Sequence, residues 1–221
     1  MIKYYDKLLL SLSEIPGHPS MLVHALTGCT FHCYNCFNYD LLINTKHDTF
    51  YSIDNLLVLI KKQENLFDYL IFSGGEYLAA DIDDLISDLT KVRKNTDKKI
   101  IIYTTGVYYS KMKTLFTLGL VDGFHIDMKL PYHLLTEDDF ELIELTMGLN
   151  LNNLKIFEDL LKSIDFVVSS DLGNNRIRTV RYPFASESSF EECQSYINGL
   201  NKKYGSNVPY DINPFVYPEK K

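Results

Sequence analysis

The stretch MLVHALTGCTFHCYNC, residues 21–36, joins an apolar run to a loop with three closely spaced cysteines. The run MLVHALTG has the composition of a buried strand. Cys29, Cys33 and Cys36 follow it directly. Three clustered thiols are one fewer than a closed tetrahedral metal site needs. The pattern therefore predicts a strand that delivers an incomplete set of metal ligands to one end of a sheet.

Apolar strands and amphipathic helices alternate along the rest of the chain. The expected strands after the first are 69–75, 99–106, 121–131, 176–183 and 208–215, and the expected helices are 52–65, 81–94 and 187–200. Residues 132–175 predict one or two helices, over 137–148 and 151–164. Such alternation calls for parallel strands with helices outside, and right-handed crossovers curl the sheet toward a barrel.

The length of the chain limits how far such a barrel can close. A full eight-unit barrel typically needs about 250 residues, and this chain has 221. The sequence therefore predicts an α/β fold, an incomplete (β/α)6 barrel of mostly parallel strands. Because no Gly-, Ser- or Pro-rich linker divides the chain, we expect a single domain over residues 1–221.

Composition narrows the function classes. The formal net charge of −7 argues against general affinity for nucleic acid or for an anionic membrane. The apolar patch near the N-terminus is too short for a signal peptide or a membrane-spanning helix, so we expect a cytoplasmic protein. Thiols stay reduced in that compartment, which favours a metal or catalytic role for the cysteine cluster over disulfides.

Two metals fit the cysteine loop. Zinc is one, with His24 or His32 as a possible fourth ligand. However, zinc modules usually supply ligands in two separated pairs, and the sequence has no second pair. An iron–sulfur cluster held by three thiolates is the other, and it would leave one iron open to a substrate. Cys193 shares an apolar helical stripe with Phe190 and Ile197, which indicates a core thiol.

Other unusual residues also follow predicted strands. Ser73, Gly74, Gly75 and Glu76 end the second strand, Thr104 ends the third, Asp127 and Lys129 end the fourth, and Arg178 lies in the fifth. Ligands in parallel α/β sheets bind beyond the carboxyl ends of the strands, so we expect these residues on the same rim as the cysteines.

The spacing CxxxCxxC resembles the signature of the radical S-adenosylmethionine superfamily. The stretch CTFHCYNCFN, with an aromatic residue and Asn after the third cysteine, resembles the activating enzymes of glycyl radical enzymes, including the activase of anaerobic ribonucleotide reductase. The preceding SLSEIPGHPSMLVHALTGC is similar to the opening of that subgroup. The resemblance implies a fold of radical S-adenosylmethionine type.

The same resemblance implies two cofactors, a 4Fe–4S cluster and S-adenosylmethionine. Cys29, Cys33 and Cys36 would ligate the cluster, and the amino and carboxylate groups of S-adenosylmethionine would occupy the open iron. The implied cofactor-binding residues are Asn35, Phe37, Ser73, Gly74, Gly75, Glu76, Thr104, Asp127, Lys129 and Arg178. Among these, Glu76 would accept from the ammonium, Asp127 would address the ribose, and Lys129 and Arg178 would address the carboxylate. Arg176 and Arg181 are the rival arginines, which we expect to be solvated.

The activity implied is reductive cleavage of S-adenosylmethionine to generate a glycyl radical on a partner enzyme. Anaerobic ribonucleotide reductase is the first candidate for that partner, with flavodoxin or ferredoxin as electron donor. One alternative is a small-molecule radical enzyme such as a 7-carboxy-7-deazaguanine synthase. Another is a non-catalytic zinc or iron–sulfur binding module, which would leave Glu76, Asp127 and Arg178 without a task.

Overall fold

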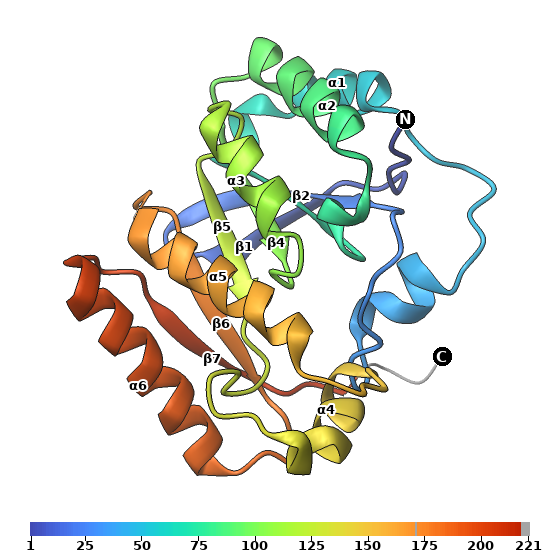
Figure 1. Ribbon diagram of the computed structural model, residues 1–221. Helices are drawn as coiled ribbons and strands as arrows, with labels where there is room; N and C mark the ends of the chain where they lie inside the picture. The colour runs from blue at the N-terminus through green and yellow to red at the C-terminus, as the bar shows by residue number, and fades with distance from the viewer. Residues whose placement is uncertain (171, 218–221) are drawn as a thin grey trace. The chain divides into compact units, whose positions relative to one another are not determined.

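The computed structural model describes residues 1–170 and 172–217 (Figure 1). The chain divides into two compact units. The first unit comprises Met1–Thr30, Asn38–Tyr103 and Ser110–Asp122, and the second comprises Phe31–Phe37, Thr104–Tyr109 and Gly123–Lys221. Because each unit is assembled from separate segments of the chain, the division marks no linker. The prediction of a single domain stays a prediction.

The first unit contains a sheet of four consecutive strands. They are β1 (Leu9–Ile15), β2 (His18–Ala25), β3 (Tyr69–Gly74) and β4 (Lys99–Thr104), the last ending at the first residue of the second unit. β1 pairs antiparallel with β2, whereas the β2–β3 and β3–β4 pairs are parallel. Parallel pairing places the carboxyl ends of β2 and β3 side by side.

A helix follows each parallel strand of this unit, as the crossover connections of a parallel sheet require. They are α1 (Ile53–Lys62), α2 (Ile82–Asn95) and α3 (Tyr109–Thr117), with short turns at Tyr39–Ile43, Glu64–Leu66 and Tyr77–Ala79. Ser52 and Asn55 form a capping box that starts α1, and the side chain of Asp81 accepts from Asp83 N to start α2. Acidic residues open α2, and Arg93 and Lys94 occupy its last turn, the order that the helix dipole favours.

The second unit repeats the pattern. The strands β5 (Gly123–Asp127), β6 (Arg176–Arg181) and β7 (Tyr210–Pro214) pair in parallel, and the helices are α4 (Phe140–Met147), α5 (Lys155–Ser170) and α6 (Glu187–Tyr204), with a short turn at Glu137–Asp139. α5 and α6 contact one another. Their apolar faces bury Phe157, Ile164, Phe190 and Ile197.

Most predicted elements are found, with shifted ends. The strand predicted over 21–28 runs instead from His18 to Ala25, because Thr27 and Gly28 bond to the loop after β3. The strand predicted over 121–131 covers only Gly123–Asp127. The two helices predicted within 132–175 are present as α4 and α5.

Two elements of the first unit were not predicted. β1 was missed because it is an edge strand whose residues are mostly exposed, which removes the alternation that marks a half-buried strand. The nine-residue α3 was missed because it buries only Met112 and Leu115. No helix among the described residues is long and apolar enough to cross a membrane.

Candidate cofactor site

Gly74 and Gly75, at the end of β3, lie too close to the end of β2 for any larger residue. A Cβ built at Gly75 would stand 2.0 Å from the carbonyl oxygen of Gly28, and one at Gly74 would stand 2.3 Å from that of Ala25. Gly74 also has a φ of +126°, a conformation that L side chains rarely adopt. Both glycines are therefore required by the contact between the two strand ends, which leads directly into Cys29.

The backbone of Glu76 is hydrogen-bonded to Thr27 and Gly28, in the segment between β2 and Cys29. Its N–H donates to Gly28 O over 2.7 Å, and its carbonyl accepts from Thr27 Oγ1 over 2.7 Å. Its side chain is fully buried, and Oε1 accepts from Leu78 N over 3.1 Å. The carboxylate is thus held in one orientation by the turn at Tyr77–Ala79, which makes it a fixed acceptor.

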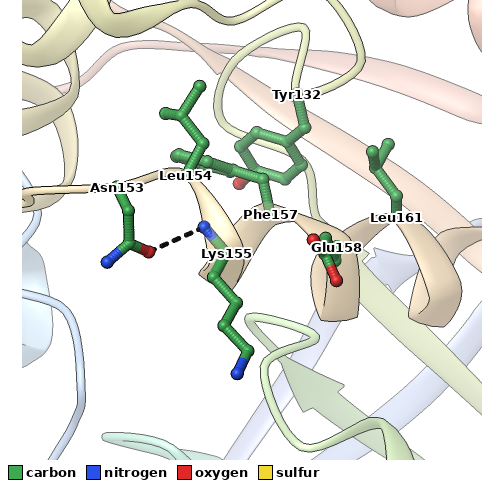
Figure 2. Close-up of a pocket in the computed structure, with 7 residues that line it drawn as sticks. All are labelled: Tyr132, Asn153, Leu154, Lys155, Phe157, Glu158 and Leu161. Atoms are coloured by element: carbon green, nitrogen blue, oxygen red, sulfur yellow. Dashed lines mark hydrogen bonds between the residues drawn. The ribbon is translucent and has the colours of Figure 1, made fainter.

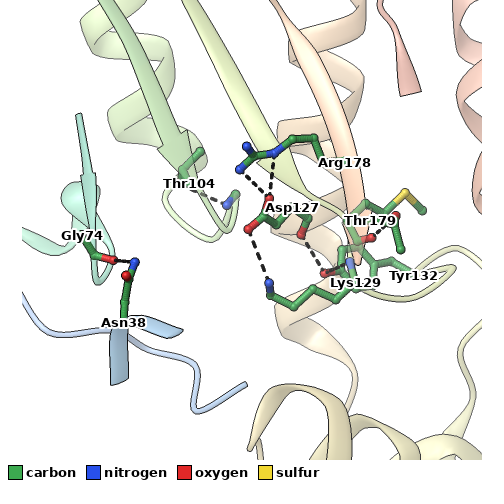
Figure 3. Close-up of polar contacts among 10 residues, drawn as sticks. Asn38, Gly74, Thr104, Asp127, Lys129, Tyr132, Arg178 and Thr179 are labelled. Atoms are coloured by element: carbon green, nitrogen blue, oxygen red, sulfur yellow. Dashed lines mark hydrogen bonds and ion pairs between the residues drawn. The ribbon is translucent and has the colours of Figure 1, made fainter. Parts of the chain in front are cut away.

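Two residues that the sequence analysis left out of the site support this loop. Asn38 Nδ2 donates to Gly74 O over 2.6 Å (Figure 3). Lys111 Nζ donates to the carbonyl oxygens of Leu78 and Ala80 over 2.9 and 2.6 Å. Asn38 could have been found, because it is the Asn of the CFN motif. Lys111 gave no sequence signal, since it lies on the unpredicted α3.

The cysteine loop of the second unit is shaped by backbone bonds. His32 N donates to Met147 O over 2.8 Å, and Tyr34 N donates to Thr146 O over 3.1 Å, so the end of α4 holds the loop. Cys36 N donates to Cys33 O over 3.1 Å, and Asn35 between them has a φ of 45°. Asn tolerates this left-handed conformation better than most residues. The predicted role of Asn35 in cofactor binding is untested, but its role in the turn is clear.

The thiols of the loop differ from the core thiol in burial. Cys29, Cys33 and Cys36 are half-buried, whereas Cys193 is buried on α6. Burial raises the pKa of the Cys33 thiol, and the ammonium of Lys129 opposes that shift. Partly shielded thiols suit an iron–sulfur cluster. Within residues 1–170 and 172–217, no three His, Cys, Asp or Glu side chains stand in a metal-binding arrangement, so ligation by the three thiolates stays a prediction.

Aromatic rings surround the turn between Cys33 and Cys36. The Tyr34 ring centroid lies 5.1 Å from that of Phe184 and 5.7 Å from that of Phe215. Tyr182 lies 5.6 Å from Phe184 and 5.8 Å from Phe215. We call these four rings the aromatic cage. No sequence pattern predicts Tyr182, Phe184 or Phe215 at this place, because they come from the loop after β6 and from the residue after β7.

Phe31, within the cysteine loop, and Phe37, directly after it, differ in burial. Phe31 is buried, whereas Phe37 is 57% exposed. The predicted contact of Phe37 with a cofactor stays a prediction.

A charge cluster lies at the carboxyl end of β5 in the second unit. Asp127 is in register with Arg178 of β6, and Asp127 Oδ1 accepts from Arg178 Nη2 and Nε over 2.9 and 3.2 Å. Lys129 Nζ lies 3.5 Å from Asp127 Oδ2, and Tyr132 Oη accepts from Lys129 N over 2.9 Å (Figure 3). Burial works against the charge of Asp127, yet Arg178 and Lys129 hold the pKa of its carboxyl below the usual range.

The three neighbouring arginines are therefore distinguished by their partners. Arg176 pairs with Asp211, Arg181 pairs with the exposed Glu187, and Arg178 pairs with Asp127. Of the three, Arg178 has the least exposed side chain, at 15%. The structure thus brings Asp127, Lys129 and Arg178 together as predicted and separates the two rivals from them.

Ser73 and Thr104 end neighbouring strands. Ser73 is half-buried and in register with His24 of β2. Thr104 is buried, and its Oγ1 accepts from Gly106 N over 3.1 Å, which turns the chain sharply after β4. Their predicted contacts with the cofactor stay predictions.

A pocket of about 540 Å³ also lies in the second unit, along α5 (Figure 2). It is lined by Tyr132, Asn153, Leu154, Lys155, Phe157, Glu158 and Leu161. Asn153 Oδ1 accepts from Lys155 N over 3.0 Å and so caps the helix. None of the predicted cofactor residues lines this pocket.

Two solved structures share the fold of this chain. "Native anSMEcpe with bound AdoMet" has a TM-score of 0.55 and 18% identity, covering 88% of this chain and 52% of that chain. "Native anSMEcpe with bound AdoMet and Cp18Cys peptide" has a TM-score of 0.51 and 18% identity, covering 88% of this chain and 50% of that chain. This chain spans about half the length of these structures. The likeness confirms the predicted fold class, the incomplete barrel of radical S-adenosylmethionine type.

A further structure, "Crystal structure of QueE from Escherichia coli", has a TM-score of 0.48 and 12% identity, covering 98% of this chain and 95% of that chain. That similarity is too low to carry an argument. No curated protein matches this chain.

A comparison with protein-family models identifies the family of this chain. The model of the 4Fe–4S single cluster domain matches residues 15–142, more than half of the chain. The chain therefore belongs to the 4Fe–4S single cluster domain family, which confirms the predicted cluster. Family and fold together support membership of the radical S-adenosylmethionine superfamily. The glycine contacts, the fixed Glu76 and the three half-buried thiols all fit these cofactors.

Proposed function

We propose that this protein is an activase that uses a 4Fe–4S cluster and S-adenosylmethionine to form a glycyl radical on a partner enzyme. The observation that carries the proposal is the bond from Asn38 Nδ2 to Gly74 O, 2.6 Å long. It joins the CFN motif, which resembles the activases, to the Gly-Gly-Glu turn. Asn38 thus has a definite task in shaping the predicted cofactor loop.

The proposal gives the cysteines and Glu76 separate roles in holding the cofactors. Cys29, Cys33 and Cys36 hold the cluster. Glu76, already fixed by Leu78 N, offers its remaining acceptor capacity to the ammonium of S-adenosylmethionine.

Asp127 and Arg178 serve the polar groups of the same cofactor. Their mutual bonds, 2.9 and 3.2 Å long, hold both side chains in place before any ligand arrives. The planar guanidinium of Arg178 suits a carboxylate better than an ammonium does. Lys129, whose side chain is only 8% exposed, adds positive charge beside them.

The chemistry itself belongs to the cofactors. A bound cluster, reduced by the electron donor, would supply the one electron that splits the C–S bond of S-adenosylmethionine. The products would be methionine and 5′-deoxyadenosine, which would carry the hydrogen atom taken from glycine. The protein positions the target Cα–H, for which close placement counts more than general affinity. Glycine suits this reaction because it lacks a Cβ, so its loop can enter a narrow opening.

A polypeptide substrate has support from the comparisons. One structure of the same fold is described as having bound AdoMet and a peptide, Cp18Cys. The partner we propose is anaerobic ribonucleotide reductase, with flavodoxin or ferredoxin as the electron donor. The sequence features that favour this subgroup are the CFN motif and a cysteine count that leaves no ligands for a second cluster.

The test is anaerobic incubation of the reconstituted protein with reductant, S-adenosylmethionine and anaerobic ribonucleotide reductase. We expect a doublet EPR signal on the partner, and we expect it to be lost when the radical glycine of the partner is changed to alanine. Turnover of a pterin-like molecule without any protein radical would favour the small-molecule alternative. No cleavage of S-adenosylmethionine at all would favour a non-catalytic module.

A further inference from the structure

Four polar side chains of the first unit lie on one face of its sheet, and one of them, Ser73, directly precedes the Gly-Gly-Glu turn. His24 of β2 is in register with Ser73 of β3. Ile71 of β3 is in register with Ile101 of β4, so Ser73 and Tyr103, each two residues further on, share a face. Tyr103 Oη donates to Glu14 Oε2 over 2.7 Å, which brings β1 into the group. We call Glu14, His24, Ser73 and Tyr103 the polar face cluster.

The two faces of this sheet differ in character. Met21, Val23 and Phe72, which alternate with the cluster residues, are fully buried and apolar. Glu14, Ser73 and Tyr103 are only half-buried. Ile71 and Ile101, on the same face as the cluster, are also fully buried, so access to a ligand is confined to the end of that face where Ser73 and Tyr103 lie.

His24 supplies the second observation. Its side chain is among the buried ones, with 6% of the residue exposed, and its Nδ1 has no hydrogen-bond partner among the described residues. Burial lowers the pKa of His24, and the nearby Glu14 opposes that shift. A buried polar nitrogen without a partner is costly, and each such group calls for an explanation. A ligand that bonds to Nδ1 would provide one.

The side chains of the polar face cluster restrict which chemical groups could bind there. No member is a permanent cation, and Glu14 can only accept hydrogen bonds when ionised, so phosphates and carboxylates are disfavoured. The two hydroxyls and the imidazole can each donate or accept. A group with an N–H donor beside a carbonyl acceptor, that is, an amide, matches this set.

We infer that the polar face cluster binds an amide group of the substrate, and, resting on the proposed function, that this amide belongs to the glycine loop of the partner enzyme. Glu14, held in place by the Tyr103 hydroxyl, accepts from the amide N–H, and the imidazole of His24 donates to the carbonyl. The cluster would thereby select the substrate segment, while Cys29, Glu76 and Asp127 serve the cofactors. A lactam edge of a small heterocycle offers the same chemistry and is the other source to test.

The test measures binding to the full-length protein with its cluster reconstituted. A fluorescently labelled peptide copying the glycine loop of anaerobic ribonucleotide reductase is one probe, and pterin is the other. We expect Tyr103→Phe and His24→Leu each to weaken peptide binding about tenfold, since each removes one buried hydrogen bond. We expect His24→Asn to recover part of the loss, because its amide nitrogen can stand in for Nδ1.

The matched control is Tyr204→Phe, which removes a tyrosine–carboxylate bond of the same kind, to Asp165, on a different part of the surface. Iron content and melting temperature check that each variant is folded and loaded. Peptide binding that is the same in the cluster variants and in the wild type overturns the inference.

The two probes separate failure of the inference from failure of the proposed function. If pterin rather than peptide binds, and the cluster variants weaken it, the cluster is an amide site but the proposed function is wrong. If the wild type forms the glycyl radical and the variants bind normally, the function stands and the cluster inference is wrong. If the wild type binds neither probe, the amide-binding inference is overturned.

Discussion

At the scale of single residues, the four cysteines provide the most direct test. Cys29→Ala, Cys33→Ala and Cys36→Ala should each abolish the brown cluster absorbance, because each removes a predicted thiolate ligand. Cys193→Ala should keep it, at a cost of about 1–2 kcal/mol in stability, since this thiol is buried in the core. Iron content and visible absorbance after reconstitution measure the outcome. Loss of iron in Cys193→Ala would contradict the three-ligand assignment.

Asp88 predicts a distinct pH dependence of stability. Its carboxylate accepts from Tyr4 Oη over 2.7 Å in the first unit, and burial raises its pKa. An acid whose pKa is raised by folding contributes stability below its unfolded pKa of about 3.9 and loses it as pH rises through the folded value. Asp88→Asn removes this titration but can still accept from Tyr4. Relative to the wild type, the variant should therefore gain stability as pH rises from about 4 to 7.

Urea denaturation of both proteins across that pH range measures the difference. Asp54→Asn is a control, because Asp54 is an exposed acid that binds Lys91 on the surface of the same unit. A difference between the wild type and Asp88→Asn that does not vary with pH would show that Asp88 does not titrate as described.

Site residues could be predicted from the sequence only where a residue with suitable chemistry stands in or at the end of a predicted strand. Asp127, Lys129 and Arg178 were recognised because they follow or lie in predicted strands. In the structure, Lys129 Nζ lies 3.5 Å and Arg178 Nη2 lies 2.9 Å from the carboxylate of Asp127. Asn38 stands in the CFN motif, but its bond to Gly74 O, like the bonds of Lys111 to Leu78 O and Ala80 O, could be assigned only from the folded chain. Such bonds leave no mark in the sequence.

At the scale of elements, the close contact between the end of β3 and the segment after β2 predicts that Gly→Ala substitutions at two positions change stability in opposite directions. Gly75→Ala should destabilise the protein by several kcal/mol or distort the cofactor loop, because its Cβ would stand 2.0 Å from the Gly28 carbonyl oxygen. Gly199→Ala in α6 should instead stabilise by about 0.5–1 kcal/mol. Among the described residues, no atom lies within 4 Å of a Cβ at Gly199. Thermal denaturation compares the two, and equal effects would contradict the close contact.

The position of the aromatic cage predicts that its rings shield a bound cluster from solvent and oxygen. Tyr34 bridges Phe184 and Phe215, so Tyr34→Ala opens the cover over the turn between Cys33 and Cys36. We expect its cluster absorbance to bleach several-fold faster in air than that of the wild type, with a shifted reduction potential, because solvent exposure tunes such clusters. Tyr204→Ala, an exposed ring on α6, is the control. Equal bleaching rates in Tyr34→Ala and the wild type would remove the cage from this role.

Helices and strands were predicted correctly where the burial of one face produces a periodic pattern of apolar residues. The buried β3 and the amphipathic α2 were found with ends within two residues, because one apolar face dictates each pattern. The exposed β1 and the weakly buried α3 carry no such pattern. The polar face cluster was missed for the same reason, since it depends on registers between strands and not on any one segment.

At the scale of the whole molecule, cofactor binding should stabilise the folded chain. A ligand that binds only the native state at 100 times its dissociation constant adds about 2.7 kcal/mol to the stability. For a chain of this size, 1 kcal/mol corresponds to roughly 2–4 °C in melting temperature. S-adenosylmethionine at that excess should therefore raise the melting temperature of the cluster-loaded protein by about 5–11 °C.

The three neighbouring arginines show whether that shift comes from the predicted site. Arg178→Ala should lose most of the shift, because Arg178 is predicted to bind the carboxylate of S-adenosylmethionine and is held in place by Asp127. Arg181→Ala should keep it, since Arg181 pairs with the exposed Glu187. Both variants remove one arginine and one ion pair from the same strand, so they differ chiefly in the proposed ligand contact. Differential scanning fluorimetry under anaerobic conditions measures the shift, and an equal loss in both variants would refute the assignment of Arg178.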